Sequence, residues 1–467
     1  MSTFSGLNTA TTALWAQRRG LDVTGQNIAN VNTVGYSRQR VDLQAMGGNT
    51  VPAFFSVSHA VGGGVSADDV ERIRDAFLEA RAQQEHATSS RLTAEADALG
   101  QIEQALREPG DTGIQALLTE MWAGWEDVGN NPHEEPARGQ LLERLDTLAG
   151  GLRSARASLD QQWDQTRENL QTLLIDVNNA VAAVAELNQA IQRATASGLP
   201  ANELADRRDT LVLELAATIG ATGRAGSDGT VDVVVGGITL VAGSTATRVG
   251  LAGATESGGV GSDAPRIVTV PGGATMRSGG TAEGQLAALV DIVPEYQQRL
   301  DALAAGIAAA LNSAHAEGYG LDGAPGGAIF GGGASGTDPV TAANITLLVT
   351  DPRRVAASKV PGGALDGSHA DAIAQLRLQP TGPDVSYRRL VVELGVQTSV
   401  VERNLGIQAV ITAQVDASRE SVAGVNLDEE MTNMLSFQHA YSAAGRLVTA
   451  IDETLDQLIN RTGLVGR

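Results

Sequence analysis

The sequence predicts an α+β, multidomain fold: a bundle of paired long N- and C-terminal helices, or stalk, that carries an inserted β-rich head domain. Three observations support this prediction. Apolar residues recur at helical spacing over both ends of the chain. Valine-rich runs separated by glycine turns occur in the middle. The 467 residues are enough for several domains with cores of their own.

The first thirty residues contain a seven-residue repeat of large aliphatic side chains. The repeat consists of Leu7, Leu14, Leu21 and Ile28. Ala10 and Val31 lie on the same stripe. Seven-residue spacing places these side chains on one helix face and is typical of a helix that packs against another helix. We therefore expect an N-terminal helix that contributes to an assembly surface.

Helical periodicity continues through the first half of the chain. It predicts helices over 73–106, 118–128, 145–191 and 202–219. The run Asn130-Asn131-Pro132 is expected to end the second of these helices, and Gly220 the last.

The middle of the chain has strand character. Residues 231–235 and 238–241 are apolar runs on either side of Gly236-Gly237, which predicts a β-hairpin with a two-residue turn. Further strands are expected over 267–270 and 345–349, within glycine-rich sequence. A helix from about 281 to 317, with Pro294 near its first turns, is expected to interrupt this region.

The C-terminal part returns to helical spacing, over 387–422 and again from Asn426 onward. Asn426 is predicted to cap the last helix, with Glu429 three residues later as in a capping box. An apolar seam with alternating steps of three and four follows. It consists of Met434, Phe437, Tyr441, Ala444, Val448, Ile451, Leu455 and Leu458. Two seam-forming ends predict that the ends pair with each other and with neighbouring copies, and that both termini lie at one pole.

These patterns predict three domains. Residues 1–40 and 424–467 form coiled-coil-like terminal helices. Residues 41–219 and 385–423 form a long-helix bundle. Residues 220–384 form the β-rich head with one long helix, about 281–317.

Composition argues against several functional classes. The net charge of −21 disfavours nucleic acid and anionic membrane surfaces as partners. The chain has no cysteine, its histidines lack metal-ligand spacing, and it has no apolar run of membrane-spanning length or cleavable signal peptide. Gly331 to Gly336 matches a dinucleotide fingerprint, but Asp338-Pro339 follows in place of a helix. We expect no catalytic residue, no cofactor and no metal.

The N-terminal helix is expected to stop in a segment rich in asparagine, residues 27–36, because asparagine and glycine tolerate left-handed backbone. This segment resembles the N-terminal signature of flagellar rod, hook and hook-associated proteins. Its continuation, Ser37-Arg38-Gln39, resembles the hook-associated protein 1 family, as do residues 424–431 and 437–441 near the other end. Residues 204–211 resemble it more weakly. The motif positions are Asn27, Asn30, Asn32, Gly35, Tyr36, Asn426, Leu427, Asp428 and Glu429.

The resemblance implies a structural protein that forms the junction ring between hook and filament of the bacterial flagellum. The implied partners are copies of itself, the hook protein, hook-associated protein 3 and a cytoplasmic export chaperone on the C-terminal helix. Export through the flagellar type III pathway would make the protein transiently cytoplasmic and then extracellular at the hook–filament junction.

Two alternatives stay open. A rod or hook protein shares the N-terminal signature, although residues 426–430 and the long helices over 73–107 and 141–192 argue against it. A secreted enzyme with a site in the head is the other alternative, and the absence of a histidine–carboxylate cluster in the head argues against it.

Overall fold

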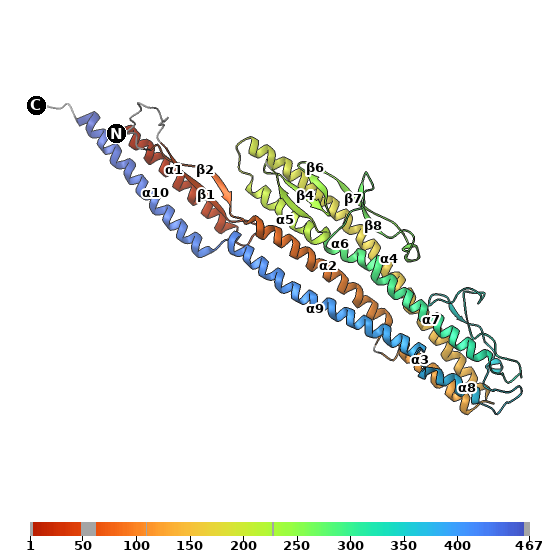
Figure 1. Ribbon diagram of the computed structural model, residues 1–467. Coiled ribbons are helices and arrows are strands. Elements are labelled where there is room, and N and C mark those ends of the chain that lie inside the picture. The colour runs from red at the N-terminus through yellow and green to blue at the C-terminus, as the bar shows by residue number, and fades with distance from the viewer. Residues whose placement is uncertain (1–2, 48–61, 109, 227, 462–467) are drawn as a thin grey trace, which may run out of the picture.

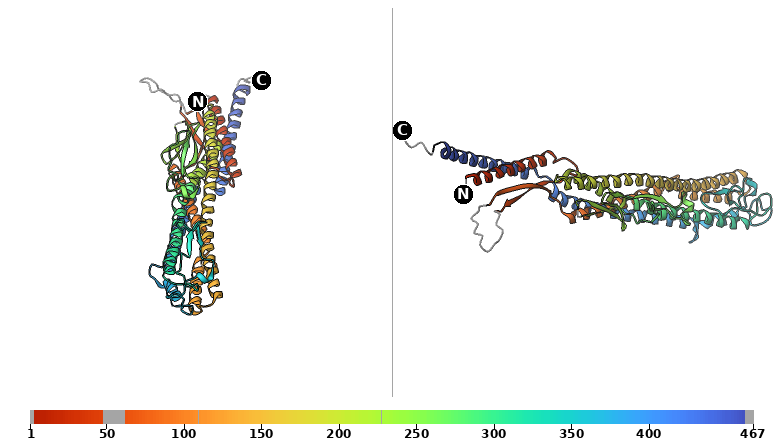
Figure 2. Two further views of the ribbon diagram at one scale, coloured as in Figure 1. Left: turned by 90° about the vertical axis from the view of Figure 1, so that its right-hand side faces the viewer. Right: turned by 90° about the horizontal axis from the view of Figure 1, so that it is seen from above.

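A computed structural model of the chain describes residues 3–47, 62–108, 110–226 and 228–461. The ends of the predicted terminal domain, residues 1–2 and 462–467, lie outside this description. Long helices run lengthwise and build an elongated rod, with both chain ends at one end of it (Figures 1 and 2). There α1 (Thr3–Ala29) and α10 (Leu427–Asp456) lie side by side. The predicted pairing of the two terminal helices is confirmed.

Among the described residues, five further helices outside the 281–317 region belong to the body of the rod. They are α2 (Ala76–Leu106), α3 (Ile114–Asn130), α4 (Glu135–Ala196), α5 (Asn202–Ile219) and α9 (Pro383–Ala423). α2 packs against α9, and α3 and α5 pack against α4. Gly220 ends α5 with a φ of 74°, a conformation that favours glycine, so the predicted stop is confirmed. No helix among the described residues is long and apolar enough to cross a membrane.

The long helix expected at 281–317 is present but not uniform. It consists of α6 (Gly280–Ala287), a π-helical turn η2 (Ala288–Ile292) and α7 (Val293–Ala316). Pro294 lies two residues after this wider turn, at the second position of α7. Because proline has no N–H to donate, a local change in the hydrogen-bond pattern accommodates it within one continuous helix. The remaining helical segments are η1 (Ser257–Gly259), η3 (Pro352–Arg354), α8 (Ser368–Ala374), η4 (Gln375–Leu378) and η5 (Gln457–Arg461).

The described strands form four small antiparallel sheets. β1 (Gln39–Met46) pairs with β2 (Gly64–Arg72), and this hairpin lies beside α1. β3 (Thr222–Ala225), β4 (Val231–Val235), β5 (Ile238–Ala242) and β6 (Thr245–Ala246) form a four-stranded sheet in that order. β7 (Arg248–Ala252) pairs with β8 (Arg266–Val270), and β9 (Phe330–Gly332) with β10 (Ile345–Leu347).

The predicted hairpin over 231–241 is confirmed. Its turn residues Gly236 and Gly237 have φ values of 55° and 86°. A type I′ turn requires a positive φ at both central positions. The β1–β2 hairpin is a structure that the sequence analysis did not predict.

The described strands share a core with the long helices, so the expected separate head is not confirmed. They lie along the side of the long helices (Figure 1). One hydrophobic core cluster includes Leu99 and Trp125 of the helices and also Val233 and Ile267 of the sheets. On α4, Asn188 donates hydrogen bonds to the carbonyl oxygens of Val231 and Gly243, at 2.8 and 2.7 Å. The limits of the three domains stay a prediction.

Candidate assembly site of the terminal helices

The two terminal helices approach each other closely because α1 presents small residues to α10. A Cβ atom added to Gly20 would lie 2.6 Å from the ring of Phe437, so the ring occupies the space that a side chain at position 20 would need. Near the other end of α1, a Cβ on Gly6 would lie 3.5 Å from Cδ1 of Ile451. Gly6 thus lies opposite Ile451, and Gly20 opposite Phe437, so the two helices run antiparallel.

The predicted seam of α10 lies mostly toward α1. Ala444 is buried, and five further seam residues are half-buried: Met434, Phe437, Val448, Ile451 and Leu455. Tyr441 and Leu458 are 42% and 54% exposed. The role of all these residues in assembly stays a prediction.

The leucine repeat of α1 lies at the edge of the helix contact. Leu7, Leu14, Leu21 and Ile28 are all half-buried. The close contacts with α10 involve Gly6 and Gly20, each one residue before a leucine of the repeat. The repeat therefore leaves part of its apolar surface open to solvent beside α10.

Asn27 joins α1, α10 and the β1–β2 hairpin. It is almost completely buried, and its side-chain nitrogen donates to the carbonyl of Gln39 at 2.9 Å and to Glu430 at 3.1 Å. Its side-chain oxygen accepts from the Gln39 N–H at 3.0 Å and from the Tyr36 hydroxyl at 2.8 Å. Burial, followed by the charge of Asp206, raises the pKa of Tyr36 to about 12, so the hydroxyl remains a donor. This use of both amide ends explains why asparagine occupies the position.

Glu430 and Arg38 extend this junction. The Glu430 side chain is only 2% exposed and accepts from Nε of Arg38 at 2.8 Å. The Arg38 guanidinium also pairs with Glu429 at 2.7 Å. The backbone N–H of Arg38 donates to the carbonyl of Ala423 at 2.8 Å. Asn426 caps α10 as predicted, accepting from the N–H groups of Asp428 and Glu429. The Glu429 carboxylate, expected to complete a capping box, pairs with Arg38.

A second group of charges holds the hairpin against the bundle. Arg72 pairs with Asp206 at 2.9 Å and with Asp209 at 2.8 Å, both on α5. Burial lowers the pKa of Arg72, but the two carboxylates outweigh it and raise the pKa overall. Arg74 also pairs with Asp209, and the Ser37 N–H donates to Asp206 at 3.2 Å. The terminal helices, the hairpin and α5 thus meet in one hydrogen-bonded region.

The other motif positions have local roles. Asn30 donates to the carbonyl of Gln26 at 2.9 Å, and Asn32 is exposed. Gly35 has a φ of 80°, and a Cβ there would lie 2.4 Å from the Thr210 hydroxyl, so only glycine fits without a shift. Leu427 and Asp428 are exposed at the start of α10.

Sequence reasoning missed the partners Glu430, Arg38 and Arg72. Arg38 stood within the segment that carries the resemblance, and Asp206 and Asp209 within the weaker match over 204–211. Glu430 follows Glu429 in the first turn of the last helix, where acidic residues are common, so its sequence position does not mark it as a contact residue. Across the described residues, no cluster of three histidine or carboxylate side chains could hold a metal ion.

Comparison with known proteins places the chain in a family. The model of the flagellar hook-associated protein FlgK helical domain matches residues 99–330. Models of the flagella basal body rod protein and of the flagellar basal body rod FlgEFG protein C-terminal region match residues 7–36 and 419–461. Flagellar hook-associated protein 1 of Bacillus subtilis is 31% identical over 100% of both chains. The chain belongs to the flagellar hook-associated protein 1 family.

Other relatives agree with this assignment. Flagellar hook-associated protein 1 of Escherichia coli is 25% identical, over 97% of this chain and 99% of that one. The solved structure of the flagellar hook junction protein FlgK from Burkholderia pseudomallei has the same fold, with a TM-score of 0.63 and 17% identity, covering 75% of this chain and 100% of that chain.

Membership in the hook-associated protein 1 family decides between the alternatives. The rod models match only the two ends, whereas the relative from Bacillus subtilis matches throughout, which excludes a rod or hook protein. The chain is a structural protein of the flagellum at the hook–filament junction, outside the cell, and it is not an enzyme.

Proposed function

We propose that the terminal helix pair builds the junction ring, by contacts with neighbouring copies, with the hook protein and with hook-associated protein 3. The observation that carries this proposal is apolar surface left uncovered on the pair. The leucine repeat of α1 is half-buried, and Tyr441 and Leu458 of α10 are exposed. A helix pair that leaves such side chains in water gains free energy when other helices cover them.

The test uses exposed residues, so that folding of the single chain is preserved. Tyr441→Asp with Leu458→Asp replaces the wild type in cells, and the matched control is Ile175→Asp, 61% exposed on α4. We expect hooks without filaments for the double variant and normal filaments for the control, seen by electron microscopy. Full filaments on cells with the double variant would contradict an assembly role of α10.

We further propose that the chain leaves the cell through the flagellar type III pathway, with α10 held by a cytoplasmic chaperone beforehand. The face offered to the chaperone comprises Met434, Tyr441, Val448 and Leu455. Val448 and Leu455 are half-buried on the side toward α1, so chaperone binding and helix pairing compete for them.

Calorimetric titration of the full chain with its cognate chaperone tests this competition. Val448→Asp with Leu455→Asp should weaken binding, whereas Val392→Asp with Val410→Asp, on the exposed side of α9, should not. Equal affinity of wild type and the first double variant would reject the assignment of this face.

A further inference from the structure

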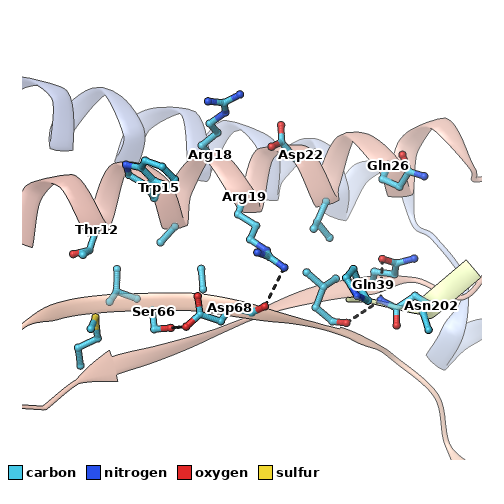
Figure 3. A pocket seen from close by; sticks show the side chains of 18 of the residues that line it. Thr12, Trp15, Arg18, Arg19, Asp22, Gln26, Gln39, Ser66, Asp68 and Asn202 are labelled. Atoms are coloured by element: carbon cyan, nitrogen blue, oxygen red, sulfur yellow. Dashed lines mark hydrogen bonds between the residues drawn. The ribbon is translucent and has the colours of Figure 1, made fainter. Parts of the chain in front are cut away.

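A groove runs along α1, between this helix, the β1–β2 hairpin and the start of α5 (Figure 3). Its volume is about 1130 Å³. Trp15 of α1 lines it and is 74% exposed, whereas Trp122, Trp125 and Trp163 are buried in the core. Arg19 reaches from α1 to β2 and donates to the carbonyl of Asp68 at 3.0 Å (Figure 3). A large indole in an open groove is typical of a contact site for another protein.

The leucine repeat lies on the opposite edge of α1. The line of α1 that contacts α10 passes through Gly6, Gly20 and Asn27. Each residue is rotated by about 100° around the helix axis from the one before it. A residue one position after a contact residue, such as Leu21 after Gly20, therefore lies on one side of the contact line. A residue one position before a contact residue, such as Arg19, lies on the other side of the contact line, where the hairpin is. The terminal pair thus has a groove on one edge and an apolar ridge on the other.

The groove is long enough to receive part of the ridge, and its lining combines apolar side chains with charged ones. From Leu7 to Ile28 the ridge extends over about 32 Å at the helical rise of 1.5 Å per residue. The part of α1 that lines the groove, residues 11–26, extends over about 22 Å. Apolar side chains of Ala16, Val65 and Val70 contribute to the lining. About four turns of a ridge helix fit along such a groove.

We propose that this groove receives the leucine ridge of a second copy of the chain. The proposal rests on the ring assembly proposed above and names the surfaces that form it. The groove and the ridge are different surfaces of α1. Each copy can therefore bind one neighbour through its groove and the other neighbour through its ridge. Such a heterologous contact continues from copy to copy and closes into a ring when the rotation allows. Because both surfaces adjoin the α1–α10 contact, the ring extends an interface that each chain already has.

Cysteine crosslinking tests the contact directly, since the chain has no cysteine of its own. Two differently tagged variants, Ala67→Cys in the groove and Leu21→Cys on the ridge, are expressed together, and isolated hook–filament structures are oxidised. The control pairs Ala67→Cys with Glu402→Cys, exposed on α9. We expect roughly tenfold more mixed dimer than in the control, because a fixed approach raises the effective thiol concentration. Equal yields would overturn the proposal.

A further variant separates the two proposals. Trp15→Asp should fold normally, because the side chain is exposed, but should leave hooks without filaments. Filaments on cells with Trp15→Asp, together with bare hooks on cells with the double variant Tyr441→Asp and Leu458→Asp, would overturn the groove contact. The assembly role of the terminal helix pair would then stand. If both carry filaments, both proposals are overturned. Unchanged thermal melting of purified Trp15→Asp protein confirms that the effect is on assembly.

Discussion

Replacing Glu430 by alanine should open the terminal helix pair. The Glu430 carboxylate is 2% exposed and accepts from Asn27 at 3.1 Å and from Arg38 at 2.8 Å. Removing one partner of a buried ion pair destabilises a protein by about 3–5 kcal/mol, because the charge of the other partner stays buried without an opposite charge beside it. Arg38 keeps Glu429 as a second partner, so we expect the lower part of this range or slightly less, about 2–3 kcal/mol.

Hydrogen exchange of the full chain, resolved by segment, measures this loss. A change of 2–3 kcal/mol lowers protection of α1 and α10 by about 30- to 150-fold, at about 1.4 kcal/mol per factor of ten. Protection of α4 should not change, since its core is independent of the junction.

Two variants control this experiment. Glu429→Ala removes a carboxylate that is 58% exposed, and we expect an effect below about 1 kcal/mol. Glu430→Gln retains an acceptor for Asn27 and should lie between the two alanine variants. Equal protection of wild type and Glu430→Ala would refute the assignment of Glu430 as the central contact of the pair.

Three further predictions concern other parts of the chain. Leu455→Asp should abolish filament attachment, seen by electron microscopy, while calorimetry shows the bundle melting at its usual temperature, because Leu455 lies on the terminal pair alone. Burial lowers the pKa of His315 from 6.5 to about 4, so the unfolded chain binds a proton at a higher pH than the folded one. The contribution of His315 to stability should therefore be constant above about pH 6.5 and fall by up to about 3 kcal/mol toward pH 4, and urea titrations of His315→Gln should lack it. Asn188→Ala removes the hydrogen bonds from α4 to the carbonyls of Val231 in β4 and of Gly243 in the β5–β6 turn and should lower the free energy of unfolding by about 2–4 kcal/mol, measured in urea.

The sequence predicted those elements whose own residues determine them. The limits of α5 follow from helical spacing and from Gly220, and the β4–β5 hairpin from its Gly236-Gly237 turn. The β1–β2 hairpin escaped prediction because its strands carry polar residues such as Asp42 and Asp69 on largely exposed faces. This hairpin is positioned by α1 and α5, and those contacts have no signal within residues 39–72.

The site was predicted only in part for a similar reason. Asn27 and Tyr36 stood out through the resemblance of their segment to a family signature. The pairing of Arg38 with Glu430 joins positions 392 residues apart, and no local pattern specifies it. Among the acids that begin α10, Glu430 differs from Asp428 and Glu429 only in facing α1, which depends on how the two helices dock.

The junction also couples the helix pair to the proposed groove. Asn27 bonds to Glu430 of α10 and to Gln39, which lines the groove on the hairpin side. Loss of the Glu430 carboxylate removes the bond from Asn27 to α10, while Asn27 keeps its bonds to Gln39 and Tyr36, so the hairpin and α1 lose their shared attachment to α10. The groove should then widen or vary in shape, which weakens a contact that depends on fit. We therefore expect Glu430→Ala, placed in both crosslinking partners, to lower the yield of the Ala67–Leu21 mixed dimer, whereas Glu429→Ala leaves it unchanged. An unchanged yield with Glu430→Ala would show that groove and helix pair are held independently.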